Sequence, residues 1–253
     1  MPDTEMSLMG RVLPQAMMER GHEIRTFMPK WGTINERRGQ LHEVIRLSGM
    51  NLIINDTDHP LIIKVASVAG SRLQVYFIDN DDYFGNRRMG ADEKGVDYAD
   101  NGERAVFFAR GVMETVKKLR WVPDIIHCQG WMSAVVPLYA KTAYKDEPSF
   151  KNVKVVTSLF PKSLKKDLGK NFKQQLEFRN VKMSMLKAYK DKFDWTELGK
   201  LAIDYSDALI KAHPKVNEKL LDYANETGLP MLDYVADDPN IGVRYEEFYD
   251  SMF

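Results

Sequence analysis

The alternation of short apolar strands with a helix between residues 124 and 159 most constrains the fold. Residues 124–128 and 153–159 are short and rich in β-branched side chains, which predicts two buried strands. Residues 131–144 between them predict a helix. This order is typical of a parallel sheet covered by helices. The sequence therefore predicts an α/β fold with a Rossmann-like, doubly wound, mostly parallel sheet and helices on both faces.

The remaining patterns extend this fold in both directions. Residues 5–20 predict a helix and residues 22–28 a strand, whereas residues 79–98 predict a long loop. Additional antiparallel strands are expected at about 41–78, in the segments 41–47, 51–55, 61–68 and 73–78. Later elements are predicted as helices at 104–119, 174–192, 195–205, 214–226 and 242–253, with a strand at 207–212.

The helix at residues 5–20 has no strand before it. Such a helix normally follows an earlier parallel strand, and only four residues precede this one. We therefore expect residues 1–253 to form a single domain that lacks its first β-strand.

Composition excludes partners that are recruited by net charge. The chain carries 36 basic and 36 acidic side chains, so no global field attracts nucleic acid or a membrane. The single cysteine, Cys128, forms no intramolecular disulfide, and no apolar run of about 18 residues is present. The sequence predicts a cytoplasmic protein without a nucleic-acid or membrane partner.

Candidate site residues follow from position, because the sequence contains no glycine-rich nucleotide loop, paired cysteines or metalloprotease motif. Ligands of open α/β sheets bind beyond the carboxyl ends of the strands. His127 follows one predicted strand and is either a proton donor, a hydrogen-bond partner of a sugar hydroxyl or a packed side chain. Trp131 is either a platform for a sugar ring or a core residue. Gln129 and Gly130 either shape the loop or contact a ligand, and Cys128 is expected to be a buried hydrophobe.

A second candidate group precedes the helix at 104–119. Asp100 either caps this helix or lies with Asn101 and Arg104 at the edge of the same cleft. The acidic side chains at 79–82 predict a solvated turn, since they lack a calcium-loop pattern. The lysines between 162 and 173 predict a solvated face. No metal or cofactor site is predicted.

Four runs of sequence together resemble a known family, the N-terminal domain of bacterial glycogen and starch synthases. The resemblance covers roughly residues 5–160 and 196–225. It is carried by Leu13-Pro14-Gln15-Ala16 ahead of Arg20-Gly21-His22-Glu23-Ile24, by the run from Tyr98 to Ala105, by Pro123 to Trp131 followed by Pro137-Leu138-Tyr139, and by Asp207 to Pro214.

The resemblance implies one lobe of a GT-B glycosyltransferase of family 5. In that family the first lobe is associated with the glucan acceptor and the second binds most of ADP-glucose, and no metal is needed. We therefore expect that the second, nucleotide-sugar-binding domain is absent from this chain. Residues 2–8 contain neither the lysine nor the paired glycines that the family places near the donor diphosphate, and Gln129 and Gly130 replace its second histidine and its aspartate. The strand ending at 157–160, which includes Ser158, lacks the family's usual histidine and asparagine.

The resemblance implies glycogen or starch synthesis, in which glucose passes from ADP-glucose to the non-reducing end of an α-1,4-glucan. His127 is the candidate catalytic residue. The candidate substrate-binding residues are Asp100, Asn101, Arg104, Gln129, Gly130, Trp131 and Ser158. We expect no activity from the isolated chain. The alternatives are a non-catalytic glucan-binding or regulatory module that pairs with a separate donor-binding chain, and a scaffold or truncated product.

Overall fold

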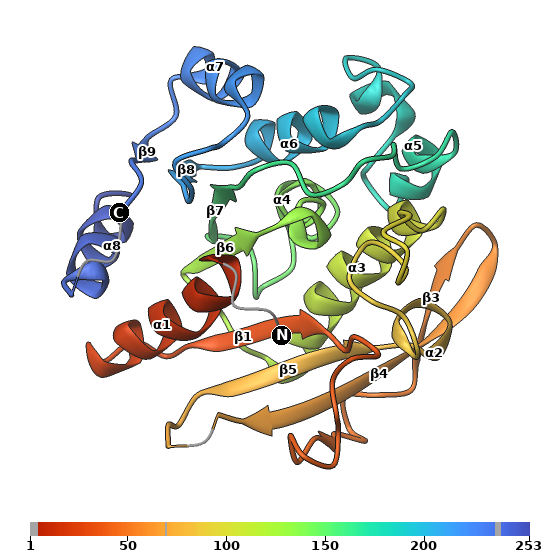
Figure 1. Ribbon diagram of the computed structural model, residues 1–253, viewed down its shortest axis with the longest axis horizontal. Helices are drawn as coiled ribbons and strands as arrows, with labels where there is room; N and C mark the ends of the chain where they lie inside the picture. The colour runs from red at the N-terminus through yellow and green to blue at the C-terminus, as the bar shows by residue number, and fades with distance from the viewer. Residues whose placement is uncertain (1–4, 69, 236–238) are drawn as a thin grey trace. The chain divides into compact units, whose positions relative to one another are not determined.

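The computed structural model describes residues 5–68, 70–235 and 239–253, and these residues form two compact units (Figure 1). Unit 1 consists of the described residues within Met1–Ile53, Asp58–Met89 and Val235–Phe253. Unit 2 consists of Ile54–Thr57 and Gly90–Tyr234. The prediction of a single domain without its first strand stays a prediction.

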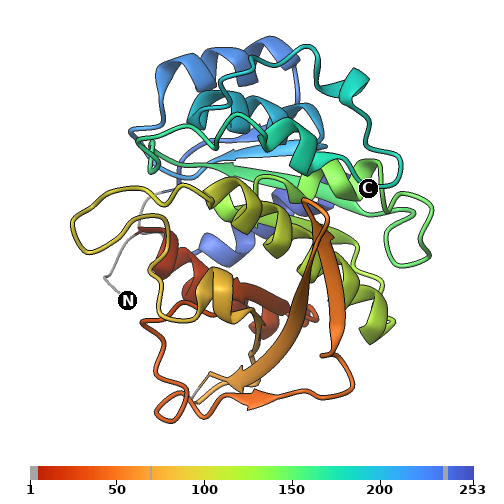
Figure 2. The ribbon, with the colours of Figure 1, turned by 90° about the vertical axis from the view of Figure 1, so that its right-hand side faces the viewer.

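The sheet of unit 1 is mixed, with the strand order β1-β5-β4-β2 and with β3 paired to β4. Strands β1 and β5 are parallel, whereas β4 runs antiparallel to β5 and to β2 (Figure 2). Alternate side chains of β4, including Leu61 and Ile63, are buried on one face, as expected of a half-buried strand. The strands are β1 (Arg25–Pro29), β2 (His42–Glu43), β3 (Met50–Ile54), β4 (Thr57–Ser67) and β5 (Gln74–Asp79).

Three helices are found among the described residues of unit 1. Helix α1 (Glu5–Glu19) packs against α8 (Ile241–Asp250), and the short α2 (Asp81–Phe84) follows β5. The Glu246 carboxylate of α8 accepts hydrogen bonds from the Arg20 guanidinium and lies 2.7 Å from His22 Nε2. Hydrogen bonds from Arg20 and His22 lower the pKa of Glu246, and the one from Arg20 has the larger effect. The two ends of the described chain are therefore joined within one unit.

The sheet of unit 2 is entirely parallel, with the strand order β6-β7-β8-β9. Its strands are β6 (Ile125–Gln129), β7 (Lys154–Leu159), β8 (Ala208–Lys211) and β9 (Met231–Leu232). The long α3 (Asn101–Leu119) precedes β6, and α4 (Val136–Lys141), α6 (Trp195–Asp204) and α7 (Glu218–Thr227) connect the strands. Leu159 and Leu209 of the strands form a buried cluster with Ile203 of α6 and Leu220 of α7. The α/β class with a mostly parallel sheet is confirmed.

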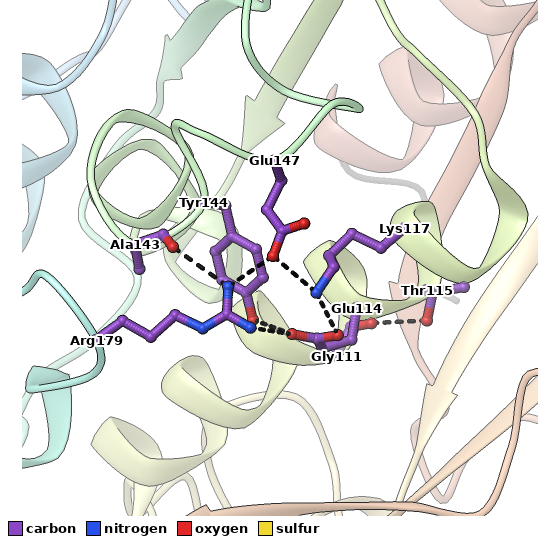
Figure 3. Close-up of polar contacts among 8 residues, drawn as sticks. All are labelled: Gly111, Glu114, Thr115, Lys117, Ala143, Tyr144, Glu147 and Arg179. Carbon is purple, nitrogen blue, oxygen red and sulfur yellow. Dashed lines mark hydrogen bonds and ion pairs between the residues drawn. The ribbon is translucent and has the colours of Figure 1, made fainter.

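A charged network in unit 2 joins α3 to two later segments (Figure 3). The Tyr144 hydroxyl donates a hydrogen bond of 2.8 Å to Glu114 Oε1. Lys117 Nζ lies 3.3 Å from Glu114 Oε2 and 3.0 Å from Glu147 Oε1, which also accepts a 2.9 Å hydrogen bond from Arg179. The Arg179 guanidinium lies 4.8 Å from the centre of the Tyr144 ring. The two acids and two bases thus balance each other around a buried tyrosine.

The predicted helix at 174–192 is wrong. Helix α5 (Phe172–Leu176) ends at Leu176, and the following residue, Glu177, is extended. The 3₁₀ turn η2 (Met183–Leu186) is the only further helical element described before residue 192. Arg179 adopts a left-handed conformation with φ 51°. The ring of Phe178 lies 4.0 Å from the Arg110 guanidinium. Tertiary contacts therefore outweigh the helical pattern of this segment.

Smaller corrections concern the ends of elements. The predicted helix at 131–144 is divided into the 3₁₀ turn η1 (Trp131–Ser133) and α4, because Pro137 lies in the first turn of a new helix. The predicted strand at 41–47 is reduced to β2, and the predicted loop at 79–98 contains α2. The predicted single sheet is two sheets, one in each unit. Strand β9 is not predicted from the sequence.

Candidate functional site

All eight predicted site residues lie in unit 2. Strands β6 and β7 are neighbours in register, so that Gln129 at the end of β6 is opposite Ser158 near the end of β7. The carboxyl ends of the two strands meet, as predicted. The loop after β6 and the last residues of β7 therefore form one edge of the sheet.

His127 and Ser158 form a hydrogen-bonded pair at this edge, with 2.7 Å between Nε2 and Oγ. Ser158 is buried, and burial lowers the pKa of His127 to about 4. The imidazole is therefore neutral at pH 7. An imidazole that transfers a proton to a substrate must first be protonated and thus positively charged. This geometry favours a hydrogen-bonding role for His127 over proton donation.

The loop after β6 is shaped by its own backbone. Gly130 has φ 78° and ψ 169°, a conformation that is accessible mainly to glycine. The Ser133 hydroxyl donates to the carbonyl oxygens of Gln129 and Gly130, at 2.9 and 3.0 Å. Trp131 is only 5% exposed, so it is placed as a core side chain rather than as an open platform. Cys128 is buried as expected, and burial raises the pKa of its thiol.

The second predicted group surrounds the first turn of α3. Arg104 is fully buried; its Nη1 donates a 2.8 Å hydrogen bond to Asn101 Oδ1, and its guanidinium lies 4.9 Å from the centre of the Tyr98 ring. Asp100 is partly exposed, and its side chain makes no capping hydrogen bond. Its carbonyl oxygen accepts the Arg104 N–H at 3.0 Å. Arg104 is thus part of the internal framework, and Asp100 is the more accessible member of the group.

Gly90 brings the two groups together. Its carbonyl oxygen accepts a 2.8 Å hydrogen bond from Asn101 Nδ2. A Cβ atom at position 90 would lie 3.4 Å from Cζ2 of Trp131, so the backbone of Gly90 packs on the indole. The segment that begins at Gly90 therefore connects α3 with the loop after β6.

Several residues of this region are not predicted from the sequence. Glu103 accepts hydrogen bonds from Asn55 Nδ2 and Gln175 Nε2 at 2.8 and 3.1 Å. Asp97 is 6% exposed, and its Oδ2 accepts the backbone N–H groups of Lys165 and Lys166. These partners are distant in sequence, so no local pattern predicts the contacts.

The expectation of a fully solvated lysine face is wrong at one position. Lys173 is 7% exposed, and its Nζ donates to the carbonyl oxygen of Tyr189 at 2.6 Å and to Asp191 Oδ1 at 2.9 Å. Its ammonium therefore holds the 189–191 turn on α5 rather than facing solvent.

A cavity of about 660 Å³ lies in unit 1, and none of the eight predicted residues lines it. Within the described part of the chain, no three histidine, cysteine or acidic side chains are grouped as metal ligands. Among the described helices, none has the length and apolar character needed to cross a membrane.

The sequence is similar to curated glycogen synthases. Residues 4–232 match the family model described as the starch synthase catalytic domain. The glycogen synthases of Chlorobium luteolum and Chlorobaculum tepidum are 42% and 44% identical to the chain over 147 residues. The aligned part covers 58% of this chain and 30% of each relative, so the chain spans about a third of the length of these relatives.

A solved structure shares the fold. The catalytic domain of starch synthase IV from Arabidopsis thaliana, bound to ADP and acarbose, superposes with a TM-score of 0.68 at 16% identity. The match covers 91% of this chain and 48% of that one, which has the GT-B architecture. Together with the family model, which spans most of the sequence, these similarities show that the chain belongs to the starch synthase catalytic domain family of glycosyltransferases.

Proposed function

We propose that this chain provides the acceptor-binding half of a glucosyl transfer from ADP-glucose to the non-reducing end of an α-1,4-glucan, as in glycogen synthesis. We further propose that the isolated chain does not turn over. The proposal is supported by the family and by the hydrogen-bonding groups of the predicted site.

The observation that carries the proposal is the state of the site's two basic side chains. Burial keeps His127 neutral at pH 7, and Arg104 is fully buried against Asn101 and Tyr98. Transfer from a sugar nucleotide requires positive or amide groups that hold the charge developing on the leaving diphosphate. Glucan hydroxyls require only hydrogen-bonding partners, which the His127 and Ser158 pair and the Asp100 carboxylate supply.

A non-catalytic glucan-binding or regulatory module is the second candidate. In this case a separate chain would bind ADP-glucose and complete the enzyme. The same hydrogen-bonding groups favour it, since glucan binding alone needs no cation. The two candidates differ in one measurable property. If this chain is half of the enzyme, glucosyl transfer by its mixture with a donor-binding chain depends on the site residues of this chain. If it is a non-catalytic module, the transfer does not depend on them.

Binding is tested by affinity electrophoresis of the full chain in native gels that contain glycogen. We expect retarded migration of the wild type and less retardation of Asp100→Ala. Asp124→Ala is the matched control, because Asp124 is exposed and is not a predicted site residue. Migration of the wild type that is independent of glycogen concentration would overturn the acceptor-binding proposal.

Turnover is tested by measuring ADP release from ADP-glucose in the presence of glycogen. We expect the purified chain to release ADP no faster than His127→Ala. A wild-type rate well above that of the variant would contradict the proposal that the isolated chain is inactive.

A further inference from the structure

Two segments that are far apart in the chain close around the first turn of α3. One is the 90–98 hairpin, which is closed by a 3.1 Å hydrogen bond from the Tyr98 N–H to the carbonyl oxygen of Gly90. The other is the β7–α5 loop, residues 160–171. Both segments belong to unit 2, as do all the predicted site residues.

Asp97 fixes the hairpin to the β7–α5 loop. This residue is 6% exposed, and its Oδ2 accepts the backbone N–H groups of Lys165 and Lys166 at 2.5 and 2.8 Å. In the opposite direction, Lys165 Nζ donates to the carbonyl oxygen of Gly95 in the hairpin at 3.1 Å. Hydrogen bonds to a carboxylate are among the stronger ones, and a buried carboxylate is costly without them. The two segments are therefore held in one arrangement.

The hydrogen bonds of Asp97 connect the two groups of predicted site residues. Lys165 lies seven residues after Ser158 of β7, and Asp97 lies three residues before Asp100 at the start of α3. A link between Asp97 and Lys165 limits how far the chain that leaves β7 can move from Asp100. It therefore sets the position of Asp100 relative to the His127 and Ser158 pair.

Apolar packing supports the same arrangement. A Cβ atom at Gly90 would lie 3.2 Å from Cδ2 of Leu164 and 3.4 Å from Cζ2 of Trp131, so the hairpin backbone packs on the loops after both strands. A Cβ atom at Gly102 would lie 2.7 Å from the carbonyl oxygen of Leu168. Leu164 and Leu168 are buried. The β7–α5 loop is thus packed on the hairpin and on the first turn of α3.

We infer that Asp97 is a positioning residue of the acceptor site, which holds Asp100 in place and thereby sets the affinity for the glucan. The inference rests on the proposed function, because it names the residue that prepares the same site for its ligand. Asp97 is buried and bonds to backbone N–H groups, so it acts through Asp100 rather than by contact with the glucan. A site whose groups are held in place before binding loses less conformational entropy when the ligand binds.

The inference is tested by affinity electrophoresis of the full chain in glycogen gels, at a temperature at which circular dichroism shows each variant to be folded. We expect Asp97→Ala to bind glycogen about three- to tenfold more weakly than the wild type. Asp97→Asn retains an oxygen acceptor and should recover most of the affinity. Asp92→Ala is the matched control in the same hairpin, because Asp92 Oδ1 accepts the N–H groups of Lys94 and Val96 within that hairpin. It should bind like the wild type.

Two further measurements separate positioning from a purely structural role. In the Asp100→Ala background, Asp97→Ala should weaken glycogen binding by less than about twofold, because the residue that it positions is gone. In the wild type, maltoheptaose should slow hydrogen exchange of the Lys165 and Lys166 amides but not of the Lys94 amide, since binding and closure favour each other reciprocally. The exchange measurement needs no variant, so it decides the question even if Asp97→Ala does not fold.

Three results would overturn the positioning role. They are equal retardation of the wild type, Asp97→Ala and Asp92→Ala, additive losses in the double variant, and unchanged exchange of the Lys165 and Lys166 amides when maltoheptaose is bound. In each case the wild type still binds glucan, so the proposed function would stand. Migration of the wild type that is independent of glycogen concentration would instead overturn the proposed function, and the positioning role with it.

Discussion

His127 Nε2 lies 2.7 Å from Ser158 Oγ, and the two residues are 31 positions apart in the chain. The contact exists because β6 and β7 are parallel neighbours whose register places Ser158 opposite Gln129. The contact joins two segments at one edge of the sheet. A sequence pattern predicts that both segments lie at this edge, but it does not predict that the two side chains touch. The imidazole of the pair is neutral at pH 7, because burial lowers the pKa of His127 to about 4.

The hydroxyl of Ser158 should contribute to stability through its hydrogen bond with His127. We expect Ser158→Ala to lower the free energy of unfolding by about 1–2 kcal/mol, because it leaves a desolvated imidazole nitrogen without its partner. Urea denaturation measures the change. Ser158→Thr retains the hydroxyl and should recover part of the loss, whereas equal losses in both variants would show that packing is responsible.

Stability should fall as the pH is lowered from about 6.5 towards 4, because of His127. Its pKa in the folded chain is about 4, against 6.5 in the unfolded chain. Between these values the unfolded state binds a proton that the folded state does not, so acid favours unfolding, by at most about 1.4 kcal/mol per pH unit. Urea denaturation across this range should show a smaller decline for His127→Gln. His42→Gln, which changes an exposed histidine, should decline like the wild type.

Asn101 should be a structural requirement of the site. Its side chain donates to the carbonyl oxygen of Gly90 and accepts from Arg104, which is fully buried. We expect Asn101→Ala to destabilise the fold by about 2–4 kcal/mol, since it removes a partner of a buried guanidinium. Asp100→Ala should cost much less, because Asp100 is partly exposed whereas Asn101 is buried. Equal unfolding midpoints of the two variants would contradict this assignment.

Gly102 should tolerate no side chain. A Cβ atom there would lie 2.6 Å from Cδ2 of Phe172 and 2.7 Å from the carbonyl oxygen of Leu168. We expect Gly102→Ala to lower the melting temperature, at a cost of about 1–3 kcal/mol. Gly10→Ala is the matched control in α1, where no heavy atom lies within 4 Å of the added carbon, and it should be neutral or stabilising by up to about 1 kcal/mol.

Local patterns predicted the elements that flank the site. Helix α3, strands β6 and β7, and helix α6 correspond to the segments expected from periodicity. This agreement has a physical reason, since a buried strand or an amphipathic helix repeats its apolar side chains at a spacing that is visible along the chain. The resemblance to the synthase family is carried by four specific runs of residues rather than by periodicity, and the family is confirmed.

The sequence by itself determined the α/β class, the positions of most of the strands and the family. Only the tertiary structure decided that Arg104 is buried against Asn101 and Tyr98, that Phe178 and Arg179 leave the helical path, and that the loops after β1 and β5 enclose a cavity. These features depend on contacts between residues far apart in the chain. Their energies exceed local propensity, and no short segment of sequence contains both partners.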